Sequence, residues 1–207
     1  MCQAEAGQSI TSGGGFSTYY LQPAYQKKAV ERYFRLSANA GKTPVAGYKV
    51  DGRGYPDISL AGFDYAVGIG GTIYGVSGTS ASAPALAGFF SNINAARIAG
   101  GKGPIGWVNP VLYSNHTLFV KDITSGHNKC GATGVCCPQG FYAMPGWDPT
   151  TGLGSIDYAK LESAFLSLGQ FVNGVIHSPT REPTQLPTSV NAQVLALSLT
   201  PTGKTAG

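Results

Sequence analysis

The fold is decided by the stretch Ser77-Gly78-Thr79-Ser80-Ala81-Ser82-Ala83-Pro84. Before it, glycines at 70 and 71 and the β-branched and aromatic run 72–76 predict a hairpin over 65–76. After it, apolar residues recur mainly at three- and four-residue steps. This periodicity predicts a helix from about Ser80 to Ala99 that ends at Gly100-Gly101. Strands that lead into helices are typical of an α/β layer structure.

Ser80 lies where this helix is expected to begin. The unpaired N–H groups and the positive dipole end of a helix N-terminus favour a developing anion, so Ser80 is a candidate nucleophile. The alternative is that Ser80 or Ser82 only caps the helix, as serine often does. We expect Pro84 in the first turn, where its missing N–H does no harm.

The composition is that of one globular domain. The 207 residues are 43% hydrophobic and 12% charged, with 30 glycines and a net charge of +4. The basic residues are dispersed, so nucleic-acid binding has no electrostatic basis. No apolar stretch approaches the ~18 to 20 residues of a membrane span. We therefore expect neither a nucleic-acid partner nor a membrane span.

Three cysteines crowd one loop: Cys130, Cys136 and Cys137. Their C-x5-C-C spacing lacks the paired C-x2-C of a zinc site, although His127 lies nearby. A disulfide from Cys130 to Cys136 or Cys137 is the favoured interpretation, and it implies an oxidising compartment. The sequon that starts at Asn115 is compatible with that compartment.

The rest of the chain predicts three further elements and a tail. We expect a helix over 23–36, a short strand over 56–60, and a helix over 156–168 capped by Ser155. Pro-Thr pairs then recur in a stretch with little charge and few aromatic residues. The division is a domain over 1–168 and a flexible Pro/Thr/Ser-rich tail over 169–207.

Four ordered stretches of the sequence carry a family resemblance. They are Ser12-Gly13-Gly14-Gly15-Phe16-Ser17 with Gln22-Pro23-Ala24-Tyr25-Gln26, Gly54-Tyr55-Pro56-Asp57-Ile58-Ser59, the serine stretch above, and Asp122-Ile123-Thr124-Ser125-Gly126 with Pro145-Gly146-Trp147-Asp148-Pro149 and Thr151-Gly152-Leu153-Gly154. Over about residues 5 to 168, the chain resembles the sedolisins, which are serine-carboxyl peptidases. The resemblance implies a subtilisin-like parallel sheet with flanking helices, with the N-terminal part of the catalytic domain missing.

A serine needs a base, and the sequence limits which base Ser80 can use. All three histidines follow Ser80, which is not the subtilisin order, and the α/β-hydrolase word G-x-S-x-G is absent. The resemblance implies instead a glutamate oriented by an aspartate, and a second aspartate in the oxyanion hole. None of the carboxylates before Ser80 matches these motifs. We therefore expect the chain to be inactive alone and to require the missing part of the domain.

The resemblance also implies one calcium site. Asp122 and Asp148 resemble its two carboxylate ligands, and the carbonyls of Ile123, Met144 and Gly146 complete it. Calcium prefers such oxygen ligands. The family usually has glycine where this chain has Met144, so that ligand depends on the backbone not needing a positive φ.

Two hypotheses follow. The first is an acid-acting, calcium-stabilised serine peptidase that cleaves peptide or protein substrates through an acyl-enzyme on Ser80, as an endopeptidase or a tripeptidyl peptidase. The second is a non-catalytic calcium-binding remnant, or an incomplete gene model. The N-terminus as written lacks the basic start and apolar core of a secretory signal. The family resemblance implies a secreted, lysosomal or vacuolar protein.

Overall fold

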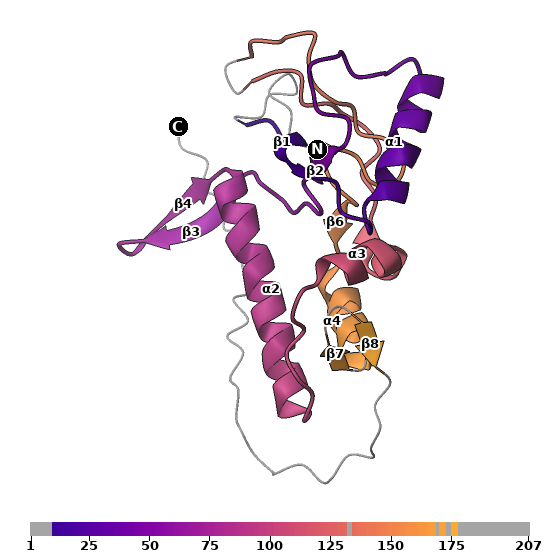
Figure 1. Ribbon diagram of the computed structural model, residues 1–207. Helices are drawn as coiled ribbons and strands as arrows, with labels where there is room; N and C mark the ends of the chain where they lie inside the picture. Colours follow the sequence, from indigo (N-terminus) through magenta and orange to yellow (C-terminus); the bar gives the residue numbers. More distant parts are fainter. Residues whose placement is uncertain (1–9, 132–133, 169, 173–174, 178–207) are drawn as a thin grey trace.

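A computed structural model describes residues 10–131, 134–168, 170–172 and 175–177, shown in Figure 1. Its helices are α1 (Lys27–Asn39), α2 (Thr79–Ala99), α3 (Asn109–Asn115), the short 3-10 helix η2 (His116–Leu118) and α4 (Tyr158–Ser167). Its strands are β1 (Gly15–Leu21), β2 (Gly52–Tyr55), β3 (Tyr65–Ile69), β4 (Thr72–Val76), β5 (Val120–Lys121), β6 (Ser155–Ile156), β7 (Gln170–Val172) and β8 (Val175–His177).

The expected parallel sheet is not formed by the described residues. Their strands make four two-stranded antiparallel sheets, β1-β2, β3-β4, β5-β6 and β7-β8. The strand expected over 56–60 is reduced to a parallel bridge between Ser59 and Ser155. The reason is that this segment bonds along one edge to a single neighbour, with Ser59 N–H donating to Gly154 and Leu153 N–H donating to Asp57.

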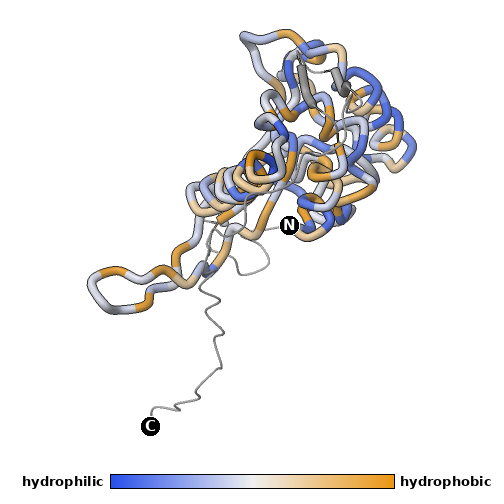
Figure 2. Tube along the Cα trace, turned by 90° about the horizontal axis from the view of Figure 1, so that it is seen from below, coloured by the Kyte–Doolittle hydropathy of each residue, from blue (hydrophilic) through white to orange (hydrophobic). Residues whose placement is uncertain are grey.

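The hairpin that the sequence predicts before the serine stretch is present in the structure. β3 and β4 pair from Tyr65↔Val76 to Ile69↔Thr72, around Gly70 and Gly71, which both have positive φ. Positive φ at both central residues is the geometry of a tight hairpin turn. The hairpin projects from the body of the molecule, and Figure 2 shows hydrophobic residues along it.

One detail of α2 differs from expectation. The helix begins at Thr79, so Pro84 is its sixth residue and lies inside it rather than in the first turn. At that position proline cannot donate to the carbonyl four residues earlier, which belongs to Ser80. The helix starts this early because Gly78, with φ +152°, turns the chain directly out of the hairpin.

The other two helices are shifted from their predicted bounds. α1 begins at Lys27, because Pro23 to Gln26 forms a turn closed by a bond from Gln26 N–H to the Pro23 carbonyl. α4 is capped by Asp157, whose side chain accepts from Lys160 N–H, and not by Ser155. Ser155 belongs to β6 and pairs with Lys121.

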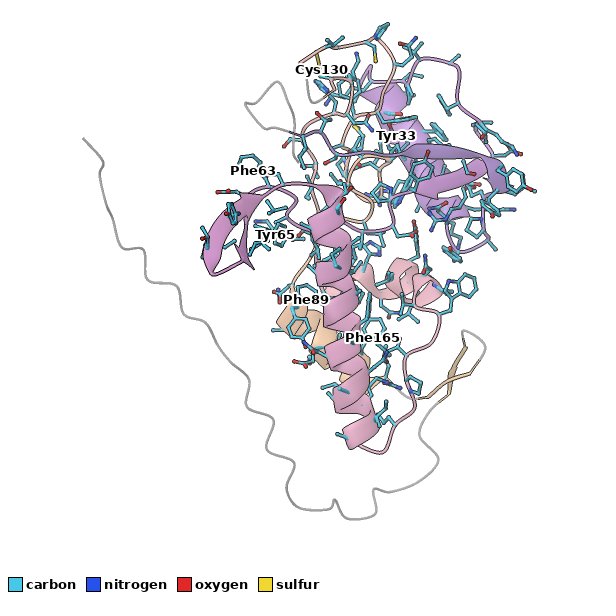
Figure 3. All side chains as sticks on the ribbon, turned by 90° about the vertical axis from the view of Figure 1, so that its left-hand side faces the viewer. Tyr33, Phe63, Tyr65, Phe89, Cys130 and Phe165 are labelled. Carbon is cyan, nitrogen blue, oxygen red and sulfur yellow. A yellow bond between two sulfur atoms is a disulfide. The ribbon has the colours of Figure 1, made fainter. Side chains whose placement is uncertain are left out.

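The core has two connected parts, which are an aromatic group that includes residues of α1 and an apolar contact between α2 and α4. Phe16 stacks on Phe34 at 5.4 Å and meets Trp147 edge-on at 6.0 Å. Figure 3 labels Tyr33 in this upper region and Phe165 in the lower one. Arg97 of α2 is buried and donates to the carbonyls of Phe165 and Leu168 at the end of α4, where a cation is favourable.

The cysteine loop contains the predicted disulfide. It joins Cys130 to Cys136, and Cys137 is a free, exposed thiol. Residues 178–207 of the expected tail lie outside the described residues, whereas 170–172 and 175–177 are the strands β7 and β8. Within the described ranges, no helix combines the length and apolar character needed to cross a membrane.

Gly54 provides a stability test of the core. A Cβ at this position would lie 2.5 Å from the Trp147 ring, which is buried. We expect Gly54→Ala to lower the free energy of unfolding by about 1–3 kcal/mol through overpacking. Chemical denaturation measures this, with Gly103→Ala as the control, because a Cβ there has nothing within 4 Å. Equal midpoints for the two variants would contradict the packing.

Candidate functional site

Ser80 is the second residue of α2 and is exposed. Figure 1 shows the N-terminal end of α2 adjoining the β3-β4 hairpin. The N-cap is Gly78, and no side chain makes a cap hydrogen bond. The capping alternative for Ser80 and Ser82 is therefore wrong.

The segment 61–64 braces this helix start. Gly78 N–H donates to the Gly62 carbonyl at 2.7 Å, and the Ser82 hydroxyl donates to the Ala61 carbonyl at 2.6 Å. On the other side of the turn, Asp64 N–H donates to Ser77 Oγ at 2.9 Å. These bonds hold both flanks of Ser80 without using its hydroxyl.

The Ser80 hydroxyl has no hydrogen-bond partner among the residues that the structure describes. His116 places Nδ1 3.2 Å from the Tyr113 carbonyl, and the His127 ring packs on Tyr142 at 5.4 Å. Neither contact involves the serine stretch. The arrangement thus presents an accessible hydroxyl at a helix N-terminus, with no base from the described part of the chain beside it.

A cavity of about 230 Å³ lies beside this helix start. Its lining comes from 10–13, 56–62 and the first turns of α2, including Thr79, Ser82 and Leu86. Ser59 Oγ lines it too, and that buried oxygen has no hydrogen-bond partner in the described structure. The cavity links the serine stretch to the segment that carries Asp57.

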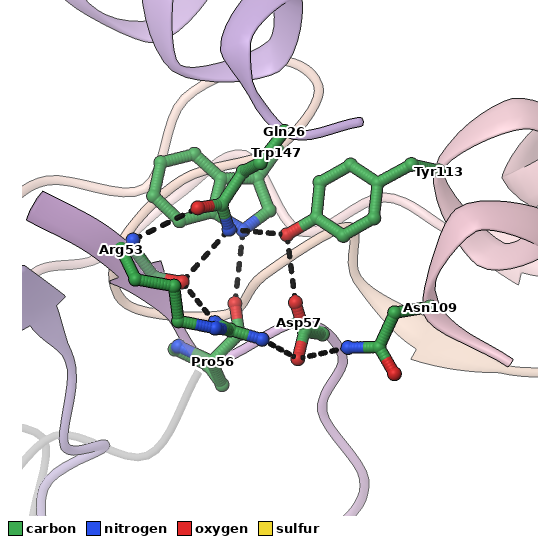
Figure 4. A network of polar contacts seen from close by, with 8 residues as sticks. Gln26, Arg53, Pro56, Asp57, Asn109, Tyr113 and Trp147 are labelled. Atoms are coloured by element: carbon green, nitrogen blue, oxygen red, sulfur yellow. Dashed lines mark hydrogen bonds and ion pairs between the residues drawn. The ribbon is translucent and has the colours of Figure 1, made fainter. Parts of the chain in front are cut away.

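Asp57 is the centre of a polar network that the sequence did not reveal (Figure 4). Its carboxylate accepts from Arg53 at 2.5 Å, Asn109 at 3.0 Å and Tyr113 at 2.9 Å. Gln26 NH₂ in turn donates to the Tyr113 hydroxyl at 2.6 Å and to the Gly54 carbonyl at 2.7 Å. From sequence, this aspartate is only the start of a strand. The one available signal is the i, i+4 spacing of Arg53 and Asp57.

Tyr113 is held as a hydrogen-bond donor in this network. Burial raises the pKa of its hydroxyl, and the Asp57 carboxylate raises that pKa further. A neutral phenol can donate to Asp57 while it accepts from Gln26. The network therefore joins the N-cap of α1, β2 and α3 around one carboxylate.

Asp148 is fully buried at 0% exposure. Its Oδ1 accepts from the backbone N–H and hydroxyl groups of Thr150 and Thr151, and its Oδ2 accepts from Met144 N–H at 3.1 Å. Burial raises the pKa of this carboxyl, whereas the hydrogen bonds lower it. The loop 144–152 is thus folded around a carboxylate.

The five residues expected at the calcium site lie on two loops that the structure brings together. Gly146 N–H donates to Asp122 Oδ2 at 2.7 Å, and the Thr151 hydroxyl lies 3.5 Å from the Ile123 carbonyl. Met144 is not among the residues with positive φ, so a side chain is compatible with its backbone. In the described ranges, no three His, Cys, Asp or Glu side chains cluster as a metal site. Backbone carbonyls would have to complete the ligand set.

Comparison with known proteins gives consistent relatives. No protein-family model matches the chain. It is 41% identical over 157 residues to physarolisin of Physarum polycephalum, which covers 73% of this chain and 26% of that protein. It is 43% identical over 170 residues to aorsin of Aspergillus oryzae, which covers 77% of this chain and 25% of aorsin. The chain spans about a quarter of the length of these relatives.

A solved structure agrees with the sequence matches. Pseudomonas sedolisin, a serine-carboxyl proteinase complexed with two molecules of pseudo-iodotyrostatin, superposes with a TM-score of 0.54 and 28% identity. The match covers 79% of this chain and 37% of that one. The sequence and structure matches together show that the chain belongs to the sedolisin family, as part of a catalytic domain.

Proposed function

We propose that this chain supplies the nucleophile of a serine-carboxyl peptidase, with Ser80 as the residue that attacks the peptide carbonyl. The observation that carries the proposal is the exposed Ser80 hydroxyl at the start of α2. Hydrogen bonds of Gly78 and Ser82 hold the backbone on both sides of Ser80, and none of them involves its hydroxyl. Membership of the sedolisin family supports peptide or protein substrates.

The reaction would proceed by acyl transfer. A carboxylate removes the Ser80 proton as the serine oxygen attacks the substrate carbonyl, and the carboxylic acid so formed then protonates the leaving amine. The resulting acyl-enzyme is hydrolysed by water. The family resemblance implies that the base and the oxyanion acid are carboxyl groups outside the motifs of this chain. An oxyanion donor that is a carboxylic acid must be protonated, which favours acidic working pH. The part present here contributes the nucleophile and the N-terminus of α2.

Ser80 can be tested in a chimera in which this chain replaces the matching part of aorsin. We expect acid peptidase activity that falls at least about 10³-fold in Ser80→Ala, because catalytic groups act as a unit. Release of a chromophore from a peptide measures it, and cooperative melting checks that the chimera is folded. Ser91→Ala is the control, since Ser91 is also an exposed serine of α2. Retained activity in Ser80→Ala would remove the nucleophile assignment.

Ser82 anchors the first turn of α2, which carries Ser80, to the Ala61 carbonyl. We expect Ser82→Ala to lower the free energy of unfolding by about 0.5–1.5 kcal/mol relative to Ser91→Ala, because it removes the bond to Ala61. Both changes gain the same helix propensity, so their difference reports the bond. Denaturant melting of the 207-residue chain measures it. Ser80→Ala should match Ser91→Ala, and an equal loss in Ser80→Ala would contradict this arrangement.

We also propose one Ca²⁺ site, held by Asp122, Asp148 and the carbonyls of Ile123, Met144 and Gly146. The residues fit calcium in kind, because carboxylate and carbonyl oxygens are its usual ligands. The contacts of Asp122 with Gly146 and of Ile123 with Thr151 already draw the two loops together. A bound cation would favour the charged form of the buried Asp148 carboxyl and cross-link loops that are distant in sequence.

Asp122 gives a clean test of that site, because it is exposed whereas Asp148 also organises its own loop. We expect free Ca²⁺ at ~100 times its Kd to stabilise the chain by about 2.7 kcal/mol. Thermal melting in calcium and in chelator should show this shift for the parent chain and lose it in Asp122→Asn. The exposed Asp51→Asn serves as control. A shift that persists in Asp122→Asn would refute the site.

The disulfide indicates the kind of compartment in which the protein works. Cys130–Cys136 is a bond typical of oxidising environments, so we propose a secreted, lysosomal or vacuolar location. An acidic compartment of this kind suits the proposed acid peptidase. Fractionation of cells that express the natural gene tests this, and a cytosolic protein with reduced Cys130 would contradict it.

A further inference from the structure

A second cavity lies away from Ser80. It has a volume of about 770 Å³ and is lined by residues of α1, of α3 with η2, and of the segments around 120–122 and 146–153. Cavities of about 300–1,000 Å³ are the usual size of small-molecule sites. None of its lining residues belongs to the serine stretch or to the smaller cavity beside it.

One wall of this cavity is cationic. Lys28 and Arg32 lie four residues apart on α1 and therefore share a face of that helix. Among the described residues, neither takes part in an ion pair. Arg32 extends along the backbone of Gly146, with Nε 3.4 Å from the position of a Cβ there. Asp122 is the one carboxylate in the lining, and its Oδ2 accepts from Gly146 N–H.

Another part of the lining is aromatic. The rings of Tyr25 and Tyr113 lie 5.2 Å apart and line the cavity, as does Trp147. Trp147 is fixed by a bond from Nε1 to the Pro56 carbonyl at 2.9 Å, and Tyr113 is fixed by Asp57 and Gln26. Trp147 and Tyr113 are thus held by groups that do not line the cavity, so these two rings form a preorganised surface against which Tyr25 packs.

We propose that this cavity binds a molecule that carries a carboxylate next to an aromatic ring. Lys28 and Arg32 pair with the carboxylate, and the ring packs against Tyr25, Tyr113 and Trp147. Arginine suits this task because its planar guanidinium binds a carboxylate in bidentate fashion. Aromatic pairs add a geometric preference beyond the area they bury. The site is independent of the Ser80 chemistry, so peptidase activity does not decide it.

Calorimetric titration of the 207-residue chain tests the proposal with three probes. N-acetylphenylalanine has both groups, its amide has the ring without the charge, and acetate has the charge without the ring. We expect N-acetylphenylalanine to bind at least about tenfold more tightly than the other two. In Trp107→Phe, the emission of the remaining Trp147 should change on binding.

Variants of α1 locate the site. We expect Lys28→Gln with Arg32→Gln to weaken N-acetylphenylalanine binding at least about tenfold. The matched control is Lys27→Gln with Arg35→Gln, which removes the same charge from exposed positions of α1 outside the cavity lining. Melting confirms that both are folded. If the first double variant is not, raised salt on the parent chain takes its place and should weaken binding, because the contact is a charge pair.

Four results would overturn the proposal. The first is no binding heat from N-acetylphenylalanine at about 10 mM, because a Kd above that concentration is too weak for a specific site of this size. The second is equal affinity for either simpler probe, and the third is equal weakening of binding in the control double variant. The fourth is an affinity that neither the Lys28/Arg32 variant nor salt changes.

Discussion

The ion pair between Arg53 and Asp57 is the interaction on which much of the structure depends. Both side chains are mostly buried, with 24% and 21% of their surface exposed, and their charged atoms are 2.5 Å apart. A mostly buried carboxylate must be matched by donors, and here Arg53, Asn109 and Tyr113 provide them from β2 and α3. Removing one partner would leave the other desolvated and uncompensated. The pair therefore fixes how three segments meet.

The same segment connects this network to the serine stretch. Beyond Asp57 the backbone bonds to Leu153 and Gly154, and then reaches Ala61 and Gly62, which accept from Ser82 and Gly78. The segment between Asp57 and Gly62 is therefore hydrogen-bonded at both ends, to the 153–154 backbone and to the start of α2. The backbone that carries the Asp57 ion pair therefore also bonds to the residues on either side of Ser80, although the Ser80 side chain makes none of these bonds.

Local sequence predicted what local contacts determine. The start of α2, the hairpin turn at Gly70 and Gly71, and a disulfide from Cys130 depend on neighbours within a few residues, and the structure contains all three. The cap of α4 was assigned to Ser155 and belongs to Asp157, since a nearby strand took Ser155. Such competition between elements is not visible in a propensity or a periodicity.

The Asp57 network and the cavity walls lay beyond sequence reasoning for a different reason. Asn109 and Tyr113 are 52 and 56 residues from Asp57, so only the path of the chain brings them together. The expectation of a parallel sheet was wrong for the same reason, because strand pairing is non-local. The segment at 56–60 pairs along only one edge. Family motifs identify which residues matter, yet they do not say what those residues touch.

The exposed surface of the β3-β4 hairpin adds a last constraint. Ile69, Ile73 and Tyr74 are 56%, 67% and 50% exposed on a two-stranded sheet that projects from the body. A hairpin is marginal in water unless one face is covered. The matched part of this chain is only about a quarter of each of these relatives, so those proteins contain further polypeptide that could cover such a face. Because the hairpin leads straight into Gly78, any contact that orders it would also fix the direction in which α2 presents Ser80.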